Sequence, residues 1–380
     1  MKVTFRYKLT LSFIVVVVIC GAVSTWVGVH LIGNRIVAQA QAKVKMDLNT
    51  ARVIYQEKAQ DVLSTVRDIA ERFFLIDGLL DTNATSMKKE LRGLRERHSL
   101  DILTITDGQG RVLFRAANPE VFGDHQGDDP VVAEVLAKKE AVVSTEIVPR
   151  EELLKEGEEL AERARIMPIP TPKAKPRPLT EETSGMMLRA AAPVFDYHGN
   201  LIGVLHGGKL LNRDYELVDK IKETVYRGEV YKGKDIGTST IFQGDLRIST
   251  NVTREDGSRA IGTLIMEEVY DRVLVKGLPW IERAFVVNDW YITAYEPIKN
   301  IKDEIIGILY VGMFEDKFAD LRRGTIYIFL GITFAGMVIA VVASYFLSNG
   351  LLKPIKSLVY ASRQLGAGNL EYKVNIHSRD

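Results

Sequence analysis

The pattern of hydrophobic and polar positions divides the chain into two long apolar runs and a mixed segment between them. Neither Leu9–Ile32 nor Gly324–Leu347 contains a charged residue. Each run exceeds the roughly 20 residues that cross the hydrocarbon core of a bilayer. We therefore predict transmembrane helices over residues 9–32 and 324–347, separated by about 290 residues.

The charges around these runs predict their orientation. The first run is longer than the apolar part of a signal peptide and a helical pattern continues past it, so we interpret it as an uncleaved anchor. The basic residues at the predicted inner ends are Lys2, Arg6, Lys8, Lys353, Lys356 and Arg363. The positive-inside rule then places residues 1–8 and 348–380 in the cytoplasm. Basic residues on the outer side, such as Arg322 and Arg323, are tolerated by long translocated segments.

Residues 33–77 carry the period of a long amphipathic helix. No proline interrupts them, and such a helix is on the order of 60 Å long. Apolar residues recur at steps of three and four at Val44, Leu48, Ala51, Tyr55, Ala59, Val62, Val66, Ile69, Phe73 and Ile76. Its first part, Ile36–Tyr55, either pairs with a second copy or packs on its own chain. We favour the pairing, and with it a homodimer.

After residue 100 the period changes to that of strands. Residues 101–106 and 111–115 form strand-like runs joined by the turn Asp107–Gly110, and residues 187–194 and 201–209 form a second pair. Two strands, a helix and a long antiparallel hairpin are the order of a PAS-like α+β sheet.

The pattern of this first region recurs further along the chain. Residues 187–208 align without a gap on residues 291–312, which matches Pro193 with Pro297, Gly203 with Gly307 and Gly208 with Gly312. Gly123 falls near where Gly262 should. Residues 149–182 have no counterpart. They contain a charged helix (Glu151–Arg165) and a proline-rich stretch without regular structure, which we interpret as a surface excursion.

These features resemble the double Cache receptors of bacteria, in which two PAS-like modules lie between two membrane spans. Residues 78–215 would be the membrane-distal module and residues 216–320 the membrane-proximal one. The first module is also similar to the single Cache domains of citrate and C4-dicarboxylate sensor kinases, through Arg115–Pro119 and Leu188–Pro193. The resemblance implies a two-pass protein of the bacterial inner membrane with a periplasmic or extracellular sensor.

The same resemblance implies a ligand site in the first module. Arg115 and Arg189 would hold a ligand carboxylate, which a guanidinium can bind through two parallel hydrogen bonds. In the repeat, Arg189 aligns with Thr293 and the region of Arg115 with Ser249 and Thr250, whereas an arginine that only braces the fold should recur. The alternative is an arginine on a solvated face or paired to a nearby acid.

Asn118 stands where the family has a histidine, and we include it in the site. An amide can donate a hydrogen bond to a carboxylate but carries no charge at any pH. The ligand is therefore expected to be a small mono- or dicarboxylate rather than citrate. His98 and His125 lie near this motif and are expected to be solvated.

Four aromatic residues lie in the second module, namely Trp280, Trp290, Tyr291 and Tyr295. They could line the base of a small-molecule pocket. We favour the alternative that they pack against the sheet, and we expect this module to transmit a signal rather than to bind a ligand.

Composition and motifs argue against nucleic-acid-binding proteins, metalloproteins and enzymes. A formal net charge of +1 gives no reason to expect a nucleic-acid partner, and one cysteine with six histidines is too few for a metal centre. No phosphate-binding loop or catalytic motif occurs. We expect no catalytic residues, metal or cofactor.

Residues 348–380 resemble a partial HAMP linker. Lys353-Pro354-Ile355 would open an amphipathic helix, residues 366–370 would end it, and residues 373–377 would be extended. The second HAMP helix and an output domain are expected beyond Asp380. We favour a sensor histidine kinase. A methyl-accepting chemoreceptor, a cyclic-dinucleotide enzyme and a membrane-anchored binding module without output are the alternatives.

Overall fold

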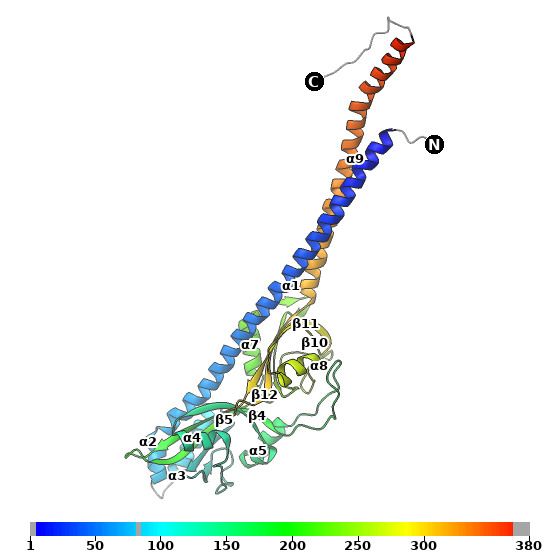
Figure 1. Ribbon diagram of the computed structural model, residues 1–380. Coiled ribbons are helices and arrows are strands. Elements are labelled where there is room, and N and C mark those ends of the chain that lie inside the picture. Colours follow the sequence, from blue (N-terminus) through cyan, green and yellow to red (C-terminus); the bar gives the residue numbers. More distant parts are fainter. Residues whose placement is uncertain (1–4, 81–84, 368–380) are drawn as a thin grey trace. The chain divides into compact units, whose positions relative to one another are not determined.

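The computed structural model describes residues 5–80 and 85–367 of the chain (Figure 1). The described parts of residues 1–39 and 316–380 form one compact unit, and residues 40–315 form a second. The helices are α1 (Phe5–Ala70), α2 (Phe73–Leu80), α3 (Thr85–Arg97), α4 (Pro130–Lys138), α5 (Arg150–Glu156), α6 (Glu158–Ala164), α7 (Glu216–Tyr226), α8 (Glu267–Tyr270), the π-helix η1 (Asp271–Val275) and α9 (Asp316–Gly366). The strands are β1 (Ile102–Asp107), β2 (Val112–Arg115), β3 (Val142–Val148), β4 (Gly185–Phe195), β5 (Leu201–Leu210), β6 (Val230–Tyr231), β7 (Lys234–Asp235), β8 (Gly237–Gln243), β9 (Leu246–Thr250), β10 (Trp280–Val286), β11 (Asp289–Lys299) and β12 (Ile305–Phe314).

The two predicted apolar segments are helical. α1 and α9 each contain a window that is long and apolar enough to cross a membrane, and neither window is buried within the protein. α9 continues through Lys353 and Pro354 to Gly366, so no new helix begins at Pro354. The predicted extended run 373–377 lies outside the described residues.

The long helix departs from its prediction in two ways. It ends at Ala70, and α2 starts a new axis that buries Leu75, while Phe73 of the predicted apolar face is exposed. From Ala40 onward the apolar face packs on its own chain, where Val44, Leu48 and Ala51 are buried. The expected pairing of Ile36–Tyr55 with a second copy is therefore wrong for this face, which the 40–315 unit occupies.

Two antiparallel five-stranded sheets of the same topology form the 40–315 unit, and the fold is α+β and PAS-like as predicted. The strand order is β2-β1-β5-β4-β3 in the first module and β9-β8-β12-β11-β10 in the second. The long hairpins β4–β5 and β11–β12 are the green and amber pairs in Figure 1.

The register of the two sheets confirms the internal repeat. Arg189 pairs with Gly208 across β4 and β5, and Thr293 pairs with Gly312 across β11 and β12. Arg115 pairs with Thr104, as Thr250 pairs with Thr240. The turn glycines match as well, because Gly123 and Gly262 both adopt positive φ, and their N–H groups bond to Val112 and Arg247 at equivalent places.

Each sheet is covered on both faces, which is why its three inner strands are buried over most of their length. In the first module α4 covers one face through Val131, Val132 and Val135, which pack against Ala191 and Val204. α1 covers the other so closely that a Cβ at Gly207 would lie 2.9 Å from Val66 Cγ2. In the second module α8 and η1 take the place of α4, and α7 lies on the opposite face.

Residues 149–182, predicted as a surface excursion from the first module, pack on the first sheet and also contact the second module. The predicted single helix is split at Gly157 into α5 and α6, which pack on the first sheet. The proline-rich part has no helix or strand but hydrogen-bonds to the second module, from Ile169 N–H to Gly262 O at 2.7 Å and from Glu267 N–H to Lys173 O at 2.9 Å. We call residues 166–178 the strap, because they join α6 of the first module to the segment that enters α8.

Candidate ligand-binding site

Arg115, at the end of β2, is fully buried and its guanidinium is held by acidic side chains. Its Nη1 and Nη2 donate to the two carboxylate oxygens of Asp124 at 2.7 and 2.9 Å. Its Nε donates to Glu156 Oε1 at 3.0 Å, and Nη1 also reaches Val121 O. Arg115 is thus bound by two carboxylates of its own chain.

The two carboxylates differ in how readily they stay ionised. The hydrogen bond from Arg115 holds the pKa of Asp124 down to about 2. Burial raises the pKa of Glu156 despite its bonds to Arg115 and Thr104. Glu156, at the end of α5, is therefore the less stable anion of the pair.

Arg189 lies on the same face of the sheet, three strands away on β4. Its Nη1 donates to Asp129, the N-cap of α4, and Nη2 donates to His206 Nδ1 at 3.0 Å. His206 Nε2 in turn lies 2.8 Å from Gln126 Oε1. Burial, together with the charge of Arg189, lowers the pKa of His206 to about 3, so the imidazole is neutral. The Nε of Arg189 is buried without a partner among the described residues.

The third predicted residue, Asn118, is less buried and contributes differently. Its Nδ2 donates to the backbone oxygen of Lys155 at 2.9 Å, so its amide holds the end of α5 next to Glu156. Thr104 connects the two arginines, because it pairs with Arg115 on β2 and with His206 on β5. Arg115 and Arg189 therefore belong to one buried polar cluster, with Asn118 at its edge.

Several members of this cluster were not predicted. They are Thr104, Asp124, Gln126, Asp129, Glu156 and His206. Asp124 and Asp129 lie in a loop and a helix cap, and Glu156 comes from the segment without a counterpart in the repeat. His206 was recognisable in principle, because it occupies an inward position of a strand two residues before the aligned Gly208.

The predicted aromatic residues of the second module do pack the sheet. Tyr291 and Tyr295 are buried in its core, and Trp280 and Trp290 lie partly buried against that core. Trp290 also holds Lys173 of the strap, whose Nζ lies 4.2 Å from the ring centre.

Comparison with known families gives a match over part of the chain. Residues 208–325 match the single Cache domain 3 family. The Cache match thus includes β8–β12 with α7, α8 and η1. Comparison with curated proteins gave no match.

Solved structures similar to the chain include three sensor domains. The periplasmic domain of LuxQ from Vibrio cholerae shares 11% identity with a TM-score of 0.41, covering 71% of this chain and 99% of that one. The sensor domain of the histidine kinase DctB from V. cholerae shares 10% identity with a TM-score of 0.40, covering 72% and 96%. The ligand-binding domain of the amino acid chemoreceptor PctB from Pseudomonas aeruginosa, in complex with L-Gln, shares 11% with a TM-score of 0.34, covering 74% and 91%.

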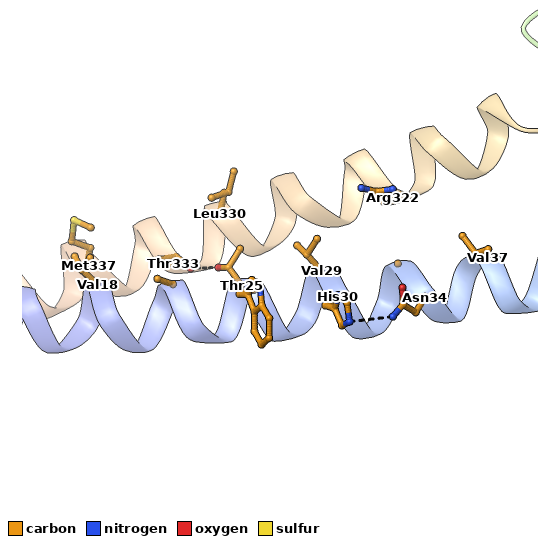
Figure 2. Close-up of a pocket in the computed structure, with 13 residues that line it drawn as sticks. Val18, Thr25, Val29, His30, Asn34, Val37, Arg322, Leu330, Thr333 and Met337 are labelled. Carbon is orange, nitrogen blue, oxygen red and sulfur yellow. Dashed lines mark hydrogen bonds between the residues drawn. The ribbon is translucent and has the colours of Figure 1, made fainter.

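A separate pocket of about 610 Å³ lies between α1 and α9 within the apolar unit (Figure 2). Figure 2 shows the Thr25 and Thr333 hydroxyls joined across the two helices, 3.2 Å apart. The helices approach closely at glycines, since a Cβ at Gly28 would lie 2.5 Å from Phe329 Cζ. Small residues and hydroxyls are what pairs helices within a membrane, so we assign this region to helix pairing.

Proposed function

We propose that this chain is the sensory part of a two-pass receptor of the bacterial inner membrane, which binds a small organic acid outside the cytoplasm. The observation that carries the proposal is the link from sheet to helix. The last strand of the Cache segment ends at Phe314 and α9 begins at Asp316, so only Glu315 separates them. A displacement of β12 would then reach the apolar helix through a single connecting residue.

The first module is the proposed site of recognition, with Arg115 and Arg189 as the ligand-binding arginines. Because Arg115 already binds Glu156, a ligand carboxylate would take the place of that side chain. Glu156 is the side chain proposed to give way, because burial raises its pKa and so disfavours its ionised form. Asn118 would act as a positioning residue that retains α5 near the site.

Signal transfer would then follow from the position of α5 and the long hairpins. Release of Glu156 changes how α5 packs against the first sheet, and the second module would pass the change to β12 and α9. Shifts of about 1–2 Å along a helix are the usual scale of such switches. A HAMP-like linker following α9 would carry the signal to a histidine kinase in a homodimeric receptor.

The experiment is calorimetric titration of the whole chain in lipid nanodiscs with small mono- and dicarboxylates. We expect one acid to bind in wild type, to lose affinity in Arg189→Met, and to gain affinity in Glu156→Gln, which weakens the internal competitor. Lys139→Met, at an exposed position on the C-cap of α4, is the control for charge removal. If both Arg189→Met and Glu156→Gln bind the acid with the affinity of wild type, the first module is not the binding site.

A further inference from the structure

The turn between β11 and β12 of the second module contacts the first module. We call its residues 300–304 the tip. Residues 302–304 are exposed, whereas Ile301 is partly buried against the apolar cluster that α4 forms with the first sheet. The N–H of Ile301 donates to Oε1 of Glu146 at 3.0 Å. Glu146 lies on β3, the edge strand of the first sheet, and is only 4% exposed. A buried acidic side chain of one module therefore binds a backbone donor of the other.

The equivalent turn of the first module, residues 196–200, shows that a turn of this kind does not need such a contact. Both turns have the same internal hydrogen bonds. The fourth residue donates to the backbone oxygen of the first, and the third and fifth residues donate to the side chain of the first. Tyr197, which matches Ile301, is nevertheless 58% exposed, and no described residue accepts a hydrogen bond from its N–H. The contact of the tip is thus an addition in the second module.

The tip lies against the elements that hold Arg189. Glu146 is two residues beyond Ser144, which pairs with Arg189 across β3 and β4. α4, on which Ile301 packs, begins after its N-cap Asp129, and Asp129 accepts a hydrogen bond from Arg189 Nη1. A change at Arg189 that displaces α4 or β3 therefore changes the surface that Ile301 contacts.

The hairpin behind the tip leads to the apolar helix. β12 begins directly after the tip, and its other end is one residue from α9. The start of β12 is also close to the first module, since a Cβ at Gly307 would lie 2.8 Å from Met186 Cε of β4. Figure 1 shows β12 beside β4. Because β12 is hydrogen-bonded to β11 and β8, a displacement at the tip would move it together with the sheet.

We propose that the tip is the contact through which α4 and β3 of the first module set the position of β12. Glu146 and Ile301 are positioning residues in this proposal, and we assign neither of them to ligand binding. When α4 moves, the surface under Ile301 moves with it, and β12 follows. As a form of regulation by the first-module site, this inference rests on the function proposed above.

Hydrogen–deuterium exchange of the whole chain in nanodiscs tests the contact. Because the two turns have the same internal bonds, we expect the tip to exchange about tenfold more slowly than residues 196–200. Ile301→Pro removes the N–H, and proline is favoured at the second position of such a turn, so the hairpin is retained. Exchange of the tip should accelerate in Ile301→Pro and in Glu146→Met. Equal exchange of the two turns in wild type would overturn the proposal.

Two further variants control for the substitutions themselves. Glu146→Gln should keep most of the protection of the tip, because the amide oxygen can still accept the hydrogen bond. Tyr197→Pro places proline at the same position of the first-module turn and should leave exchange of the tip unchanged. Protection that is lost equally in Glu146→Gln and Tyr197→Pro would contradict a specific contact.

The transmission is tested by loosening α4 without any ligand. Val135→Ala leaves a cavity between α4 and the sheet. We expect it to accelerate exchange of β12 by about threefold or more, and to have no further effect on β12 in Ile301→Pro. Asp129→Asn keeps a helix cap but removes the charge that pairs with Arg189, and it should act in the same way. If β12 responds equally with and without Ile301→Pro, the coupling uses another contact and the proposal is wrong.

These outcomes separate the tip from the binding site. Calorimetry tests whether an acid binds at Arg115 and Arg189, whereas the exchange experiment needs no acid. If no acid binds but β12 responds to Val135→Ala through Ile301, the coupling is supported and the organic-acid site is wrong. If an acid binds but exchange of β12 does not depend on Ile301, the site is supported and the proposal for the tip is wrong.

Discussion

The two modules share one topology, but the buried arginine in each has different hydrogen-bond partners. In the first, Arg115 is neutralised by Asp124 and Glu156, whereas in the second Arg247 donates to the hydroxyls of Thr263 and Thr240 and has no ion pair among the described residues. Asp124 and Thr263 occupy matching positions, each directly after a glycine with positive φ. The two arginines themselves do not match, because Arg115 corresponds to Thr250 and Arg247 to Val112, so each module has placed its arginine and its partners separately.

The largest expected effect comes from removing each arginine in turn. Arg115→Met leaves Glu156 buried and unpaired, so we expect the free energy of unfolding to fall by about 3–5 kcal/mol. Arg247→Met removes an uncompensated charge and should leave stability unchanged or increase it. Chemical unfolding of the whole chain, followed by near-ultraviolet circular dichroism, measures both. If both variants lost a similar free energy of unfolding, the two arginines would not differ in how their charge is compensated.

The next effect is the response to acid, to which the first module should contribute through His206. In the folded protein the pKa of His206 is lowered to about 3. Below pH 6.5 the imidazole is therefore protonated in the unfolded chain while it stays neutral in the folded protein. Stability should therefore fall as the pH falls from 6.5 toward 3, by up to about 1.4 kcal/mol per pH unit. The charges that act on this imidazole are those of Arg189, Asp129, Arg115 and Asp124.

His206→Gln should flatten that slope between pH 6.5 and about 4.5, above the range in which Asp124 and Asp129 titrate. Burial raises the pKa of Glu156, which therefore contributes with the opposite sign in wild type and variant alike, so the difference between the two proteins reports on His206. The equivalent position in the second module is Tyr310, whose pKa burial raises to about 12. Tyr310→Phe should leave the acid slope as in wild type. A slope that survives in His206→Gln would assign the acid response to other groups.

The smallest expected effect concerns Asn118. Asn118→Ala removes one hydrogen bond to the carbonyl of Lys155 and should lower the free energy of unfolding by about 1 kcal/mol. Because its amide already has a partner, we expect the affinity for an acid to change less than threefold, on the order of 0.6 kcal/mol. A tenfold loss of affinity in calorimetry would instead make Asn118 a direct ligand donor.

The sequence predicted those features that depend on local periodicity. The strands 101–106, 111–115, 187–194 and 201–209 correspond to β1, β2, β4 and β5, and the aligned Gly208 and Gly312 occupy equivalent positions in the two sheets. The end of α1 at Ala70 was not predicted, since no proline or glycine marks it and the burial of Leu75 decides it.

The partners of the arginines could not be predicted, for a related reason. Glu156 reaches Arg115 from a segment 41 residues further along the chain, and Asp129 reaches Arg189 from a helix cap 60 residues before it. No pattern within either element indicates these contacts. Arg247 was overlooked because the resemblance directed attention to the first module, although it is the only basic residue in β9.

The strap has a thermodynamic consequence. At its start the strap follows α5 and α6, and α5 carries the Glu156 side chain that binds Arg115. Further along, the strap hydrogen-bonds to Gly262 and Glu267 of the second module. An event at one end that repositions this segment alters the free energy of the other end by the same amount that the reverse event would. A change in the packing of α5 would then also change the stability of the second module, in proportion to how tightly the strap holds the two together.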